Sequence, residues 1–189
     1  FYTPSFLFLV ETIAKTFTDG QFIKAVALLQ GPILIAFLLA ATLLYWHVSD
    51  SLLVGFILAL VSASGMESLK TFWDVIGLHA MLPRTVAMPV LMLATYTFFR
   101  TYEPDNREKS WLWIATGLLI GIVSNLHPPT GMVFATTVGI ACLPVWFKHG
   151  RRQLLSIGLL VAGVTLTGLP ILLSVLDAGT DGGVPITDF

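Results

Sequence analysis

The chain has 189 residues, of which 56% are hydrophobic and 11% are charged, and its formal net charge is -1. A mean hydropathy of +0.85 leaves too little polar surface to cover a water-soluble domain of this size. The charge balance also excludes a basic surface that would neutralise the phosphates of a nucleic acid. The composition therefore predicts a membrane protein, with membrane lipids as its surroundings and no nucleic-acid partner.

Apolar segments separated by short polar loops run along the whole chain. Each is as long as, or nearly as long as, a helix needs to be to cross a hydrocarbon core of about 30 Å. They cover residues 22–46, 51–65, 85–99, 111–126, 131–147 and 154–176. Two further segments, 4–17 and 67–82, are amphipathic and are expected to lie at the outer surface. The prediction is an all-α fold, in which residues 1–189 form a single polytopic transmembrane helical bundle with six spans and two interfacial helices.

The first amphipathic segment has apolar residues at helical spacing, and Glu11 and Lys15 stand four residues apart as a helix-stabilising ion pair. The alternative is that this segment is the end of a preceding span. Because the chain begins with Phe1 rather than Met, and residues 177–189 read as the start of a polar loop, we expect a processed chain or a fragment of a longer protein.

The orientation follows from the loops that are rich in Lys and Arg, which collect on the cytoplasmic side. Residues 100–110 and 148–153 are the two most basic loops, and two spans separate them. Both are therefore placed inside, where charges such as Glu103 are expected to be ordinary solvated topology signals. The turn at 127–130 and both chain ends are then extracytoplasmic, and we expect a bacterial inner or plasma membrane location.

Glycine and proline predict where the spans bend and where they pack closely. Gly31 and Pro32 lie within the first span and predict a kink. Small residues recur in the segments 117–121, 158–162 and 163–168, and they would let helix backbones approach one another. Packing within the chain is favoured there, with a dimer interface as the alternative.

The polar turn between the fourth and fifth spans is the first candidate site. Both spans are short, so Asn125, His127 and Thr130 are expected to face a protein-lined cavity below the outer surface. Histidine serves as a general base, or as a hydrogen-bond donor to phosphate, near neutral pH. The alternative is a rigid proline turn, formed by Pro128 and Pro129, that carries a surface histidine.

Arg84 is the second candidate, because an arginine on the outer side runs against the usual charge bias and its planar guanidinium suits phosphate or carboxylate. The alternative is an arginine that extends toward lipid headgroups.

Glu67 and Asp74, seven residues apart, are the third candidate; a carboxylate there could act as a general base or hold a divalent metal. The alternative is the solvated face of an interfacial helix. No cofactor or metal motif is indicated, and the single Cys142 excludes a cysteine metal site within the chain.

Three features give the chain a resemblance to a known class of membrane enzymes. They are the start Phe1-Tyr2-Thr3-Pro4, the segment 83–89 (PRTVAMP) that begins a span, and the hairpin 125–131 (NLHPPTG). In these features the chain resembles the membrane region of polytopic glycosyltransferases of the GT-C class, which transfer sugars from polyprenyl-phosphate carriers on the outer or lumenal side. In that class the catalytic acid lies in the first outer loop, before the point where this chain begins, so no catalytic residue is carried over.

The resemblance implies that Arg84 contacts the carrier phosphate and that His127 orients the phosphate or the acceptor, with Glu67 or Asp74 in a supporting role. A non-catalytic structural or assembly subunit of a membrane complex, with other membrane subunits as partners, is the main alternative. A transporter ranks third, because the middle positions of the spans carry almost no charge.

Overall fold

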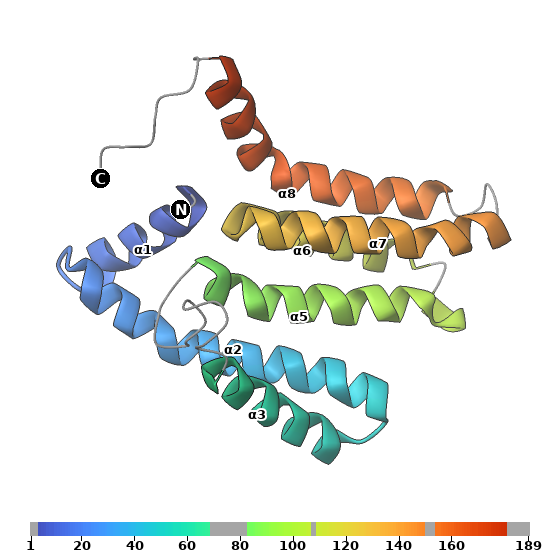
Figure 1. Ribbon diagram of the computed structural model, residues 1–189, viewed down its shortest axis with the longest axis horizontal. Helices are drawn as coiled ribbons and strands as arrows, with labels where there is room; N and C mark the ends of the chain where they lie inside the picture. The colour runs from blue at the N-terminus through green and yellow to red at the C-terminus, as the bar shows by residue number, and fades with distance from the viewer. Residues whose placement is uncertain (1–3, 69–82, 107–108, 150–153, 181–189) are drawn as a thin grey trace.

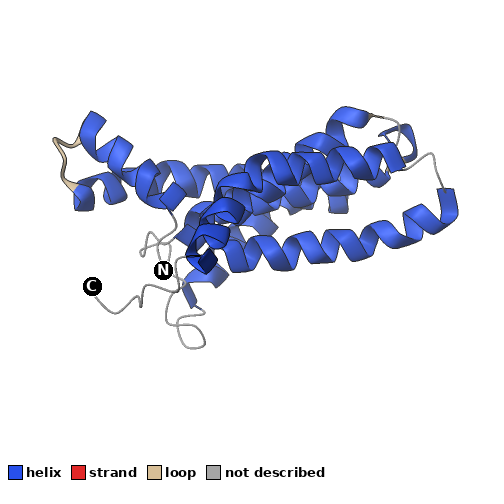
Figure 2. Cartoon of the chain, turned by 90° about the horizontal axis from the view of Figure 1, so that it is seen from above, coloured by secondary structure: helices blue, strands red, loops and turns tan. Residues whose placement is uncertain are grey.

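The computed structural model describes residues 4–68, 83–106, 109–149 and 154–180. Over these ranges the secondary structure is helical, with short turns and no strand (Figure 2). The predicted all-α class is therefore confirmed. The elements are α1 (Pro4–Phe17), α2 (Phe22–Ser49), α3 (Leu52–Ser68), α5 (Pro83–Tyr102), the short 3-10 helix η1 (Pro104–Asn106), α6 (Ser110–Leu126), α7 (Pro128–His149) and α8 (Leu154–Thr180).

Helix α6 occupies the centre of the arrangement. It packs against α5 and α8 and also contacts α7 and α1, while α2 packs against α5 and α3 against α2 (Figure 1). Helices that follow one another along the chain from α2 onward run in opposite directions, so their ends gather in two groups. We call the group formed by the starts of α2, α5 and α7 the Arg84 end, and the opposite group, which contains the end of α5, the Glu103 end.

Close contact between α6 and α8 depends on glycine. A Cβ atom added to Gly163 of α8 would lie 2.6 Å from the carbonyl oxygen of Ile114, and one added to Gly117 or Gly121 of α6 would meet α8 as closely. Thr167 of α8 adds a hydrogen bond, from its Oγ1 to the carbonyl oxygen of Leu118, at 2.8 Å. The predicted packing faces at 117–121 and at Gly163 are confirmed, whereas Gly158 has open space around it.

Helix α1 lies across the Arg84 end. Its residues Phe6, Val10 and Ala14, at four-residue spacing, form one buried face. This face belongs to a cluster that also contains Val86 of α5, with Leu126 of α6 packed against it. On the exposed side the predicted ion pair between Glu11 and Lys15 is confirmed, with an N to O distance of 2.6 Å.

Proline interrupts several of the long helices. Pro32 lies inside α2, and Figure 1 shows α2 changing direction along its length, as a kink requires. Pro170 lies inside α8, whose C-terminal part bends sharply away from α6 in the same view. Both bends lie toward the Arg84 end of the molecule (Figure 1).

Apolar side chains face outward along much of the molecule. Phe22–Ser49 and Leu154–Ile171 are long and apolar enough to cross a membrane, and only 22% of the most apolar window of each is buried. The helices Leu52–Ser64 and Ser110–Leu126 are apolar but shorter. The six-span bundle accordingly stays a prediction, whereas two helices of spanning length are found. Helix α3 continues to Ser68 and so includes Glu67, and the rest of the predicted interfacial helix at 67–82 lies outside the described residues.

Candidate functional site

The two basic candidates lie at the same end of the bundle. Arg84 is the second residue of α5, and His127 directly follows the last residue of α6. Because α5 and α6 pack against each other in opposite directions, these two positions come together at the Arg84 end. Burial lowers the pKa of His127 below the usual value of 6.5, and the positive charge of Arg84 lowers it further. The two side chains therefore form one electrostatic unit that favours a neutral imidazole.

His127 ends one helix and begins the next. Its backbone N–H donates to the carbonyl oxygen of Val123 at 2.8 Å, which closes α6. Its own carbonyl oxygen accepts from the N–H of Gly131 at 3.1 Å, which opens α7. The backbone is extended at this residue, as expected both for a helix N-cap and for a residue before proline. The rigid proline turn that we considered as an alternative is therefore present, and it fixes the histidine in place.

The imidazole ring takes part in the same turn. Its Nδ1 atom lies 2.7 Å from Oγ1 of Thr130 and 3.4 Å from the backbone nitrogen of the same residue. The other ring nitrogen, Nε2, makes no hydrogen bond to any residue of the described ranges. His127 thus uses Nδ1 in the turn, while Nε2 has no partner within the described ranges.

Arg84 is a partly buried cation whose charge is not balanced by the part of the chain that the structure describes. It makes no hydrogen bond or ion pair with any described residue, although its neighbours Pro83, Thr85 and Val86 are buried. A guanidinium held at a protein surface in this way favours an anionic partner, such as a planar carboxylate or a tetrahedral phosphate.

Asn125 has a structural task that sequence reasoning did not assign to it. Its Nδ2 donates to the carbonyl oxygen of Thr167 in α8 and, at 3.2 Å, to that of Gly121. Its Oδ1 accepts from the backbone N–H of Ile171 at 3.1 Å. Thr167 and Ile171 are the residues that a regular α-helix would join to each other, and Pro170 lies between them. The amide of Asn125 therefore bonds to the α8 backbone on both sides of Pro170, and the cavity expected beside it stays a prediction.

The acidic candidates do not enter this geometry. The side chain of Glu67, at the end of α3, and the whole of Asp74 lie outside the described residues. Among the residues that are described, no group of three or more His, Cys, Asp or Glu side chains is placed to hold a metal ion. Cys142 is buried in α7 as a free thiol.

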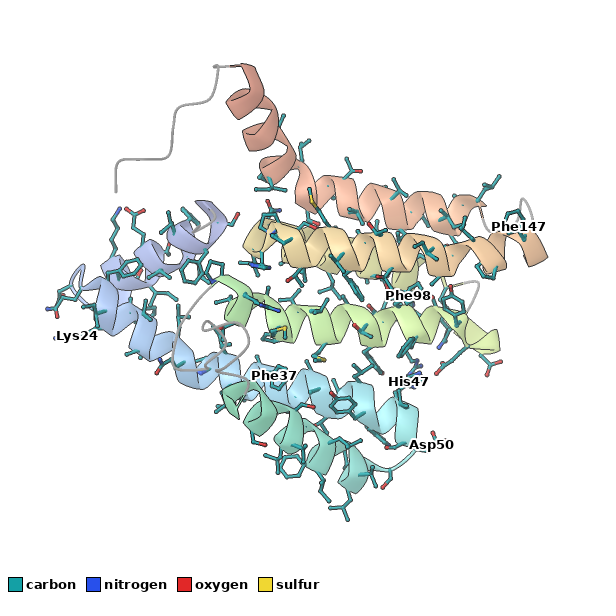
Figure 3. The ribbon with its side chains drawn as sticks, in the orientation of Figure 1. Lys24, Phe37, His47, Asp50, Phe98 and Phe147 are labelled. Atoms are coloured by element: carbon teal, nitrogen blue, oxygen red, sulfur yellow. The ribbon has the colours of Figure 1, made fainter. Side chains whose placement is uncertain are left out.

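A second polar cluster, at the Glu103 end, was not expected from sequence. Glu103 lies 3.0 Å from Nε of Arg100 and 3.4 Å from Nδ1 of His47, and it accepts a hydrogen bond from Asn106. His47 also stacks edge-on against Tyr96 of α5, with ring centroids 5.7 Å apart. Figure 3 shows His47 and Asp50 near this end of α2, with Lys24 at the other. Glu103 therefore ties α2 to α5 and is more than a solvated loop charge.

No protein-family model matches this sequence, and neither a curated protein nor a solved structure matches it significantly.

Proposed function

We propose that the chain is an integral membrane protein in which α2, α3, α5, α6, α7 and α8 all span the bilayer. The support is the outward apolar surface: Leu39 of α2, Leu53 of α3 and Leu155 of α8 are each more than half exposed. A water-soluble protein would bury helices with a mean hydropathy of 2.1 to 2.2, instead of leaving most of each apolar window uncovered. The basic loops support an extracytoplasmic location for the Arg84 end.

Within that membrane protein, we propose that Arg84 and His127 bind the phosphate of a lipid-linked carrier. The observation that carries the proposal is the partly buried Arg84, unpaired among the described residues and close enough to His127 to lower its pKa. Placing a cation partly out of water is costly, and an anionic ligand offsets that cost. Together with the resemblance to GT-C enzymes, this favours a part in sugar transfer from a polyprenyl-phosphate carrier.

A structural or assembly subunit is the second candidate, and one observation favours it. His127 and Asn125, two of the residues proposed for the site, both have structural partners within the chain that need no ligand. If Arg84 interacts only with ordinary lipid headgroups, the turn and the α8 bend are features of a scaffold. Binding measurements distinguish the two candidates.

The test measures stabilisation of the purified full chain in phosphatidylcholine nanodiscs. A polyprenyl phosphate is compared with the matching polyprenol, inorganic phosphate and phosphatidylglycerol, because a bound ligand raises the melting temperature. Arg84→Ala and His127→Ala are each expected to weaken polyprenyl-phosphate binding by about 10- to 100-fold, since a hydrogen bond to a charged group contributes about 1.5 to 3 kcal/mol.

Lys24→Ala is the matched control, because Lys24 is an exposed cation near the start of α2, which belongs to the Arg84 end (Figure 3). It is expected to bind as the unaltered protein does. Equal binding by all three variants would overturn the assignment of the phosphate site. Equal stabilisation by phosphatidylglycerol would show that Arg84 anchors ordinary lipid and would favour the structural subunit.

A further inference from the structure

The sequence His127-Pro128-Pro129-Thr130 leaves only one backbone N–H without a helical partner at the start of α7. The N–H groups of the first residues of a helix have no partner within it. Here Pro128 and Pro129 have no N–H, and Gly131 already donates to the carbonyl oxygen of His127. Only the N–H of Thr130 is left over, and it points to Nδ1 of His127 at 3.4 Å. The histidine side chain is thus the N-cap of α7.

The direction of this contact assigns the protons of the imidazole ring. A backbone N–H can only donate, so Nδ1 must present its lone pair to Thr130. The hydroxyl of Thr130, 2.7 Å from Nδ1, is placed to donate to the same lone pair. A neutral imidazole carries a single N–H, which then belongs to Nε2.

We propose that Thr130 is a positioning residue, which holds His127 in the tautomer protonated at Nε2 so that a neutral imidazole donates to the phosphate bound beside Arg84. The tautomer rests on geometry alone, and the role toward phosphate rests on the proposed function. If Nδ1 carried the proton, Nε2 would instead present a lone pair and repel a phosphate oxygen. Thr130 therefore decides whether His127 attracts or rejects the ligand, although it does not touch the ligand itself.

This arrangement also defines the ligand chemistry. The fixed positive charge comes from Arg84, while His127 adds a donor without adding charge, because burial and Arg84 lower its pKa. The site therefore presents one cation and one neutral N–H to a phosphate group. A neutral polyprenol has no anionic oxygen for Arg84 and is not expected to bind.

The experiment is nitrogen NMR of the full chain, labelled with nitrogen-15 at histidine and held in nanodiscs without ligand. The His127 signals are assigned by their absence in His127→Asn, and the shifts of the two ring nitrogens report which one carries the proton. The expected result is protonated Nε2 and a lone pair on Nδ1. A proton on Nδ1 would overturn the inference.

The variants Thr130→Val and Thr130→Ser separate positioning from folding. Thr130→Val removes the hydroxyl but keeps the side-chain shape, and we expect a mixture of tautomers with about three- to tenfold weaker binding of polyprenyl phosphate. Thr130→Ser should restore both. Thr136→Val is the matched control, because Thr136 is exposed on α7 and its hydroxyl donates to the carbonyl oxygen of Met132 within the helix.

Each proposal can fail separately in these measurements. Protonated Nε2 with no binding of polyprenyl phosphate would leave the cap in place and overturn the phosphate role of both His127 and Thr130. Retained binding with the proton on Nδ1 would overturn the positioning role and keep the phosphate site. A spectrum of Thr130→Val identical to that of the unaltered protein would also overturn positioning by the hydroxyl.

Discussion

His127 combines tasks that are usually divided among several residues. It closes α6, caps α7, and holds one ring nitrogen free of the described residues beside a cation. One side chain is sufficient for the cap because the two prolines that follow have no N–H groups that would need separate partners. A single side chain thus couples the local fold of the hairpin to the chemistry proposed for it.

The lowered pKa of His127 predicts how stability changes with pH. The folded state binds the proton less tightly than the unfolded state, whose histidine titrates near 6.5. The stabilising contribution is therefore fully present above pH 6.5 and is lost as the pH falls through the folded-state pKa, where protonation also removes the acceptor of the Thr130 N–H. Melting temperatures between pH 7.5 and pH 5 should fall more steeply for the unaltered protein than for His127→Asn, which retains a capping side chain. Parallel curves for the two proteins would contradict this prediction.

Sequence reasoning predicted that Arg84 and His127 lie on the same side of the membrane, from the charge of the loops, but it predicted neither their proximity nor the role of Asn125. Their proximity depends on α5 packing against α6 in the opposite direction. The partner of Asn125 depends instead on α8 lying against α6, and on Pro170 placing Thr167 and Ile171 within reach of its amide. Such a contact joins residues far apart in the chain, and no local pattern encodes it.

The helices meet most closely where small residues repeat. The spacing of Gly117 and Gly121 predicts a contact face, and both residues meet the backbone of α8. The same reasoning applied to 158–162 is not supported at Gly158, which has nothing within 4 Å, because spacing identifies a smooth face without saying whether another helix covers it. The Glu103 cluster was missed for a related reason. His47 and Glu103 meet only because α2 and α5 are neighbours.

Gly163 and Gly158 of α8 provide a matched pair of substitutions in one helix. In Gly163→Ala the new methyl group would lie 2.6 Å from the carbonyl oxygen of Ile114 and must push α6 and α8 apart. We expect a loss of about 1 to 3 kcal/mol in the free energy of unfolding, as is typical of overpacking. Gly158→Ala, in open space, should be neutral or slightly stabilising because alanine favours a helix. Unfolding of the purified protein in a denaturing detergent measures both, and equal stability of the two variants would refute the close packing of α6 on α8.

At the scale of the whole molecule, the bundle is a row of antiparallel helices with apolar outer faces and polar residues gathered at its two ends. Thr97 of α5 and Thr116 of α6 are an internal exception, since they are buried and bonded to each other at 3.0 Å. A polar pair of this kind orients neighbouring helices when no water is present to compete.

The all-α class and the order of the helices were predictable, because hydropathy reports them directly. The kink at Pro32 was predictable from the sequence, whereas the packing of α1 depends on tertiary contacts.

The number of spans decides which side of the membrane each turn occupies, and cysteine labelling measures it. In a Cys142→Ala background, which removes the one native thiol, single cysteines replace the exposed residues Lys15, Asp105 and Pro129. A membrane-impermeant maleimide should label Lys15→Cys and Pro129→Cys in intact cells, and Asp105→Cys only after permeabilisation. Pro129 is the decisive position, because a chain crossing the membrane only with α2 and α8 would place this turn on the same side as Asp105. Labelling of Pro129→Cys only after permeabilisation would therefore refute the six-span bundle and, with it, an extracytoplasmic phosphate site at Arg84 and His127.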